Sequence, residues 1–207
     1  MFYAGSVTPT GQTLRADAAR NRELLLAAGE REFGEKGVDV SVAEITRRAG
    51  VAKGTFFRHF TTKDDLLAAV VSHHVTALIE TGERLLDDED PGEALLEFLT
   101  EAAAQRQQHD VSFLLKAGEA DARVVEVRDQ LYATIGALVA RAHEAGKLRS
   151  DVSPTDVILL MCAPNHVVEH VTGPAPDLWR RYLAIIFDGL RPEGAHPLPH
   201  QGPGAPL

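Results

Sequence analysis

The sequence predicts an all-α protein, on the strength of two observations. Apolar residues recur at helical spacing along most of the chain, and no segment shows the strict alternation of a half-buried strand. The 207 residues are 44% hydrophobic and 25% charged, which is ordinary for a globular protein with a substantial core. The single cysteine, Cys162, excludes both an intrachain disulfide framework and a cysteine-based structural zinc site.

The sequence also predicts a cytoplasmic protein. No apolar run reaches the length that a membrane span needs. Residues 1–12 lack the basic start and the apolar stretch of a secretory signal.

The first predicted helices are short and have clear boundaries. Residues 13–36 form the first helix, which ends at Gly37 because glycine adopts positive φ without penalty. Ser41 begins a second helix, since Glu44 three residues later completes a capping box. Gly50 ends that helix, and residues 53–59 form a third.

The rest of the chain is predicted to be a series of helices followed by a tail. Thr62 is the expected N-cap of a fourth helix, which runs to about residue 87. Pro164 falls inside a later helix and predicts a kink. Prolines and glycines dominate residues 191–207, which predicts a disordered tail. The later helices are expected at residues 93–108, 111–118, 122–145, 154–170 and 177–190.

Charge is distributed unevenly. The chain carries a net charge of −9, which by itself disfavours binding to nucleic acid. Residues 1–63, however, hold ten Lys/Arg against seven Asp/Glu, whereas residues 64–207 carry a net charge of −12. The asymmetry indicates that the two parts of the chain have different functions. The basic residues 1–63 can face phosphates, whereas residues 64–207 form an acidic C-terminal body.

Residues 41–60, SVAEITRRAGVAKGTFFRHF, read as a helix, a turn containing glycine and a short second helix. This layout is typical of a helix-turn-helix that reads DNA. Phe56 and Phe60 are expected to pack inward against the neighbouring helices. The side chains left to reach outward are Lys53, Thr55, Phe57, Arg58 and His59.

Four short sequence motifs resemble those of a known protein family. They are FGEKG at 33–37, VAEITRRAGV at 42–51, KGTFFRHF at 53–60 and KDDLL at 63–67. With this spacing, residues 15–67 resemble the N-terminal domain of the tetracycline-repressor (TetR) family of transcriptional regulators. The resemblance covers about a quarter of the chain and is specific, because the turn glycine, the aromatic pair and the following lysine agree together.

The resemblance implies a dimeric all-α regulator. Residues 13–62 would form a three-helix DNA-binding domain that contains the helix-turn-helix, and residues 63–190 a helical ligand-binding and dimerisation domain. The implied partners are a palindromic double-stranded operator, a second copy of the chain and a small-molecule effector. The expected function is that of a ligand-released repressor, without a cofactor, although the sequence does not separate repressor from activator.

The resemblance also implies individual roles. Lys53, Gly54 and Thr55 would begin the recognition helix in the major groove. His59 and Lys63 would contact phosphates, and Arg47 and Arg48 would lie where the second helix crosses the backbone.

Two positions depart from the family pattern. Phe57 stands where the family usually has a tyrosine on the phosphate backbone, so a hydroxyl contact is lost. Ala52 replaces a frequent serine, which weakens the cap of the third helix.

The C-terminal body carries no sharp motif. Dimerisation is expected through the last two helices, 154–170 and 177–190, both of which carry apolar residues over a wide arc. An effector pocket between helices would be mostly apolar with a few polar groups. The candidate lining residues are Phe98, Phe113, Leu114, Met161, Cys162, Asn165 and His166.

Two other classes of function remain open from the residues alone. A helical enzyme or metal-binding protein would use the histidines, of which His166 and His170 share a helix face. No HExxH, GxSxG or GxGxxG motif supports that hypothesis, so neither catalytic nor metal-ligating residues are assigned. A helical protein–protein module is the third possibility.

Overall fold

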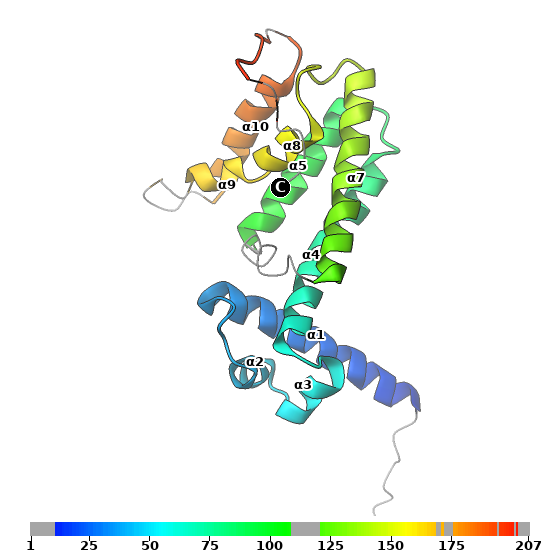
Figure 1. Cartoon of the computed structure of the whole chain (residues 1–207), viewed down its shortest axis with the longest axis vertical. Helices are drawn as coiled ribbons and strands as arrows, with labels where there is room; N and C mark the ends of the chain where they lie inside the picture. The colour runs from blue at the N-terminus through cyan, green and yellow to red at the C-terminus, as the bar shows by residue number, and fades with distance from the viewer. Residues whose placement is uncertain are drawn as a thin grey trace, which may run out of the picture. The chain divides into compact units, whose positions relative to one another are not determined.

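A computed structural model describes residues 11–108, 121–168, 171, 176–193, 195–200 and 202. Within these ranges the regular secondary structure is entirely helical, which confirms the all-α prediction (Figure 1). The chain divides into two compact units, residues 1–70 and 71–207, and helix α4 contributes to both.

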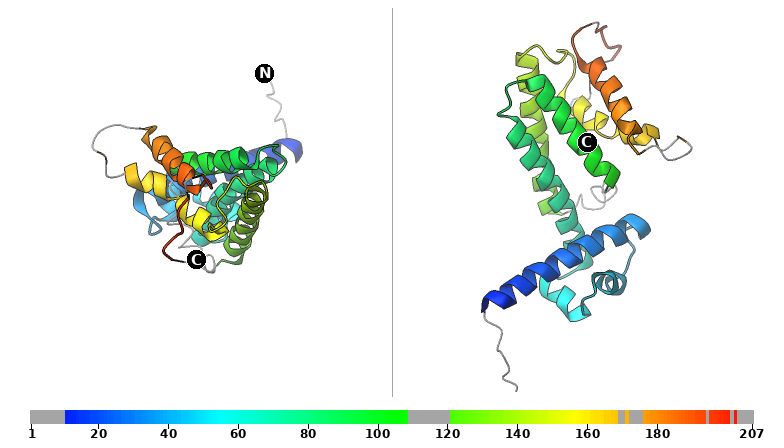
Figure 2. Two further views of the ribbon diagram at one scale, coloured as in Figure 1. Left: turned by 90° about the horizontal axis from the view of Figure 1, so that it is seen from above. Right: turned by 180° about the vertical axis from the view of Figure 1, so that it is seen from behind.

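The first unit contains the helix-turn-helix. Its helices are α1 (Gly11–Lys36), α2 (Val42–Ala49), α3 (Lys53–His59) and the first turns of α4 (Lys63–Leu85). Helices α2 and α3 lie on the same side of α1 in both side views (Figures 1 and 2). The fully buried side chains of this unit are Leu25, Phe33, Ile45, Phe56 and Leu66.

Local signals fix the ends of α2 as predicted. The Ser41 hydroxyl accepts the backbone N–H of Glu44 at 3.3 Å, and the Glu44 carboxylate accepts the backbone N–H of Ser41 at 3.0 Å. Gly50 follows α2 with φ of +68°, a left-handed conformation that a side chain would strain. The turn then delivers the chain directly into α3.

Helix α1 and the start of α4 approach each other closely at Gly29. A β-carbon built on Gly29 would lie 2.8 Å from Cδ2 of Leu66, which is itself fully buried. The hydrogen side chain of glycine therefore permits this close approach of the two helices that support α2 and α3.

The capping box gives the unit a defined response to acid. The backbone N–H and the hydroxyl of Ser41, followed by Lys36, lower the pKa of Glu44 from 4.5 to about 2. Because this pKa is lower in the folded chain, the carboxylate stabilises the fold fully above pH about 4.5, and the contribution is lost as the pH falls towards 2. We expect Glu44→Gln to flatten the dependence of the unfolding free energy on pH in this window, measured by urea unfolding.

Asp39→Asn provides a matched control for that measurement. Asp39 is an exposed carboxylate two residues before Ser41, and it takes no part in the capping box. If the Asp39 and Glu44 variants show the same pH dependence, the cap does not cause the effect.

The described part of the second unit contains the remainder of α4 and five further helices. They are α5 (Pro91–Gln108), α7 (Ala122–Glu144), α8 (Pro154–Leu160), α9 (Ala163–Val168) and α10 (Leu178–Leu190). Its core includes the fully buried Phe98, Leu95 and Ile135. The helix expected at residues 111–118 lies outside the described residues.

The prediction of one kinked helix over residues 154–170 is wrong. The structure has two helices, α8 and α9, separated by a turn at Met161 and Cys162. Pro164 has no N–H to donate to the carbonyl of Leu160, the residue four positions earlier, and its ring crowds that carbonyl. The helix therefore ends at Leu160 instead of bending, and Pro164 occupies the first turn of α9, where its missing donor costs nothing.

The described part of the C-terminal tail contains neither helix nor strand. Arg149, in the loop after α7, pairs with Asp151 at 2.6 Å and donates a hydrogen bond to the carbonyl oxygen of His196. This loop therefore contacts the tail.

Candidate nucleic-acid interface

Helix α3 has one buried face and one exposed face. Phe56 is 0% exposed, whereas the adjacent Phe57 is 52% exposed. The two rings meet edge to face with centroids 5.2 Å apart, and the buried Phe60 ring lies 5.8 Å from that of Phe56. The exposed face carries Lys53, Gly54, Phe57 and Arg58, with Thr55 and His59 half-buried beside it.

Packing rather than capping holds α3 in place. Ala52 occupies the N-cap position and provides no side-chain hydrogen bond, as its departure from the family pattern predicts. The helix has only seven residues, which is too short to be stable by itself in water. Its position therefore depends on the inward-facing rings of Phe56 and Phe60.

Arg48 is engaged inside the unit. Its Nε lies 2.6 Å from the carboxylate of Glu32, and its Nη1 and Nη2 donate to the carboxylate of Glu35, both on α1. Glu32 is only 2% exposed and also pairs with Lys36 at 2.7 Å. The network joins α2 to α1, a role that the resemblance did not indicate.

The same contacts shift the ionisation of these groups. Hydrogen bonds from Lys36, and then from Arg48, hold the pKa of Glu32 below its ordinary value. Hydrogen bonds to Glu35 and Glu32 raise the pKa of Arg48. All these charges therefore persist near neutral pH, and the guanidinium of Arg48 is directed towards protein carboxylates.

Arg47, Lys53 and Arg58 differ from Arg48. All three are exposed, and within the described part of the chain none of them makes an ion pair. Their positive charges are therefore available to an external anion, and they lie on the two helices of the helix-turn-helix.

Lys63 is held at the start of α4. The Thr62 hydroxyl accepts the backbone N–H of Asp65 at 3.0 Å, which confirms Thr62 as the N-cap. The Lys63 ammonium donates a hydrogen bond to the carbonyl oxygen of Val38, in the loop between α1 and α2. An ammonium group has three donor hydrogens, so this contact positions Lys63 and leaves donors for a second acceptor.

The predicted effector residues that the structure describes differ in their burial. Phe98 is fully buried on α5, and Asn165 is buried with its amide donating to the carbonyl oxygen of Ala103 at 3.0 Å. Met161 is half-buried, while Cys162 and His166 are exposed. Phe113 and Leu114 lie outside the described residues.

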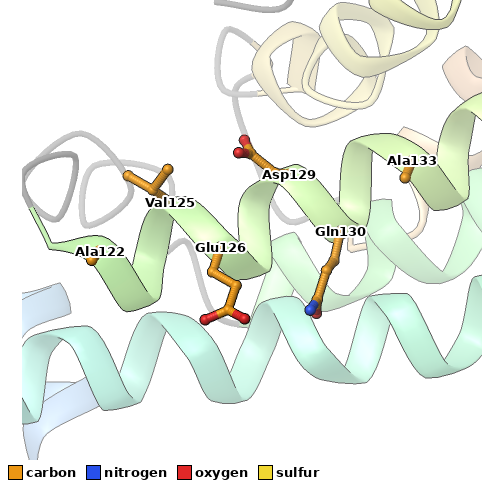
Figure 3. Close-up of a pocket in the computed structure, with 6 residues that line it drawn as sticks. All are labelled: Ala122, Val125, Glu126, Asp129, Gln130 and Ala133. Atoms are coloured by element: carbon orange, nitrogen blue, oxygen red, sulfur yellow. The ribbon is translucent and has the colours of Figure 1, made fainter.

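An open depression that no sequence motif marks runs along α7 (Figure 3). Small alanine side chains leave space for the depression, and exposed carboxylates flank it. In the sequence, such a pattern looks the same as the solvent-exposed face of any helix. Its lining residues are Ala122, Val125, Glu126, Asp129, Gln130 and Ala133.

Helix α10 is apolar on two opposite faces. Trp179, Leu183 and Phe187 are buried at 3% exposure each. Ile185 lies on the other side and is 54% exposed, with Tyr182 half-buried nearby. The stripe expected from the sequence to mediate dimerisation thus includes the outward face of this helix, and exposed apolar side chains also occur on α8 (Leu159) and α9 (Val167).

Neither a metal site nor a membrane-spanning helix is found among the residues that the structure describes. They include no cluster of three or more His, Cys, Asp or Glu side chains arranged to hold a metal ion. None of the described helices combines the length and apolar character required to cross a membrane. His170, paired with His166 in the metal hypothesis, lies outside these residues.

Comparison with known proteins agrees with the geometry of both units. The family profile “Bacterial regulatory proteins, tetR family” matches residues 25–70, and “Transcriptional regulator SbtR-like, C-terminal domain” matches residues 90–192. Among curated proteins, the HTH-type transcriptional regulator SAB2452 of Staphylococcus aureus is 32% identical over 76 residues, or 36% of this chain. That match spans only 41% of the curated relative.

Solved structures extend the similarity over most of the chain. The TetR transcription regulatory protein from Mycobacterium vanbaalenii is 33% identical, with a TM-score of 0.62, over 86% of this chain and 99% of that chain. The regulator SCO0520 from Streptomyces coelicolor is 30% identical, with a TM-score of 0.59, over 83% and 98% respectively. The chain therefore belongs to the TetR family of bacterial transcriptional regulators.

Proposed function

We propose that this DNA-binding regulator is a cytoplasmic, ligand-responsive repressor that binds a palindromic operator as a homodimer and is released by a small molecule. The observation that carries the proposal is the division of α3. Its buried aromatic side anchors the helix, while Lys53, Phe57 and Arg58 face outward. A short, firmly held helix with an exposed cationic face fits the major groove.

The contacts divide into those that position the protein and those that specify sequence. Arg47, His59 and Lys63 are proposed to contact phosphates, which contributes affinity for any sequence. Lys53, Gly54 and Thr55 begin α3 and are proposed to meet base edges, where a lysine suits the acceptors of guanine and a threonine methyl suits thymine. Their replacement should change sequence preference rather than overall affinity.

Arg47 and Arg48 are neighbours with different proposed roles. Arg47 is free to meet a phosphate, whereas Arg48 positions α2 against Glu32 and Glu35. We expect Arg47→Ala to weaken all operators alike and to reduce the salt slope by about 1.8 for a dimer, one phosphate contact per protomer. Its thermal unfolding should match that of the wild type.

Arg48→Ala is the companion variant. It leaves the buried Glu32 with one cationic partner fewer, so its melting temperature should fall. Two measurements separate the two roles. Fluorescence anisotropy gives the DNA affinity at each salt concentration, and circular dichroism gives the melting temperature. Equal salt slopes for the Arg47 variant and the wild type would remove Arg47 from the interface.

The outward face of α10 supports the proposed homodimer. Ile185 and Tyr182 form an apolar surface opposite the monomer core, and exposed apolar side chains also occur on α8 (Leu159) and α9 (Val167). Two copies joined there would present two recognition helices to two half-sites, as a palindrome requires.

The effector is proposed to bind in the second unit. The candidate residues remain Phe98, Phe113, Leu114, Met161, Cys162, Asn165 and His166. A ligand whose affinity differs between the DNA-competent and released states would shift the equilibrium between them, typically with 1–3 kcal/mol of coupling. Combined replacement of Asn165 and His166 by alanine should abolish the response to the effector and spare DNA binding.

In vitro selection of bound DNA from a random pool tests the proposed function. A repressor of this kind enriches a sequence with two-fold symmetry and binds it with strong salt dependence. Ligand screening on that site then identifies compounds that release the protein. Recovery of no symmetric sequence would contradict the proposal and favour the alternative of a helical protein–protein module.

A further inference from the structure

The N-terminal part of α1 carries exposed arginines outside the helix-turn-helix. Helix α1 begins at Gly11, whereas the match to the family profile begins at residue 25. Arg15, Arg20 and Arg22 are all exposed in this part of the helix. None of the three makes an ion pair within the residues that the structure describes, so their charges remain unneutralised.

Helical spacing places two of these arginines on one face. Arg15 and Arg22 are seven residues apart, which returns to within about 20° of the same direction at 100° per residue. Arg20 lies about 140° away from Arg15, and Asp17 about 160° away from it. The face of Arg15 and Arg22 is therefore cationic, with only alanines at positions 18 and 19 between them.

The contact of Arg22 shows which way this face points. The Arg22 guanidinium carbon lies 5.5 Å from the centroid of the Phe60 ring, and Phe60 directly follows α3. In both side views the N-terminal part of α1, in dark blue, extends beyond α3 (Figures 1 and 2). Arg15 lies a further 10 Å or so along the same face, at 1.5 Å per residue.

We propose that this α1 face, Arg15 with Arg22, is a second contact surface for duplex DNA and neutralises backbone phosphates that flank each half-site. The inference rests on the proposed function. Two features favour the phosphate backbone as the occupant, namely unneutralised positive charge and continuity, through Arg22 and Phe60, with the end of the recognition helix. Within this proposal α1 follows the duplex axis, so a displacement of about 10 Å spans about three base pairs at about 3.4 Å each and carries Arg15 beyond the sequence that α3 reads.

The test compares two lengths of the selected operator with the full-length chain. One duplex ends at the outer edges of the two half-sites, and the other carries about ten additional base pairs on each side. Arg15→Ala is expected to lower affinity for the long duplex about 10-fold at 0.1 M salt and to reduce its salt slope by about 1.8, since each protomer loses one phosphate contact. On the short duplex the variant should equal the wild type.

Arg20→Ala is the matched control, because it removes the same charge from the same helix on a different face. It should behave as the wild type on both duplexes, and Arg15→Lys should retain binding to the long duplex. Equal losses for the Arg15 and Arg20 variants, or an Arg15 loss that is the same on both lengths, would overturn the inference. Failure of the wild type to bind either duplex would instead refute the proposed function, and the inference with it.

Discussion

Replacing Phe56 with alanine is expected to lower the free energy of unfolding by about 3–5 kcal/mol and to abolish operator binding. The Phe56 ring is fully buried, and it contacts the rings of Phe57 and Phe60. Helix α3 has no side-chain cap, so the loss of this ring removes its main attachment. Urea unfolding monitored by circular dichroism measures the stability, and fluorescence anisotropy measures DNA binding.

The adjacent Phe57 supplies the control. Its ring is about half exposed, so Phe57→Ala should change stability by less than about 1 kcal/mol while still weakening DNA binding. Phe57→Tyr restores a hydroxyl that can meet a phosphate and should bind more tightly than the wild type. Equal destabilisation by the Phe56 and Phe57 alanine variants would show that α3 is not anchored through its inner face.

The second large effect is expected at the proposed dimer surface. Ile185→Asp places a charge on the exposed face of α10, next to Tyr182, where association would have to desolvate it. The chain should become monomeric, and operator affinity should fall about 100-fold or more, because the second half-site is no longer bound by a linked copy. Analytical ultracentrifugation gives the oligomeric state and anisotropy gives the affinity.

Ala184→Asp tests whether position, rather than charge, causes that result. Ala184 is exposed and lies about 100° from Ile185 around α10, away from the centre of the apolar face. This variant should remain dimeric. A dimeric Ile185 variant with unchanged affinity would exclude this face from the dimer interface.

Much of the first unit could be predicted because its signals are local. The Ser41 and Glu44 cap, Gly50 and the Thr62 cap each act within three residues, so the sequence displays them directly. The inward orientation of Phe56 and Phe60 follows in the same way from helical spacing.

Contacts between distant residues were not visible in the same way. Arg48 meets Glu32 across 16 residues and Lys63 meets Val38 across 25, and no short-range pattern distinguishes these cations from the free Arg47. The break before Pro164 does not follow from the sequence, for a different reason. A proline indicates that a helix is disturbed, but the surrounding packing decides whether it bends or stops.

The two-sided character of α3 has an evolutionary consequence. The inward-facing rings of Phe56 and Phe60 stabilise α3. The side chains at positions 53, 54, 57 and 58 are exposed, so substitutions there leave the packing of the core unchanged. After gene duplication, a copy could acquire a new target sequence through substitutions at the exposed Lys53 and Gly54, which are proposed to meet base edges, without first gaining compensating mutations elsewhere. The DNA-binding unit can therefore change the operator that it recognises during evolution while its hydrophobic core stays the same.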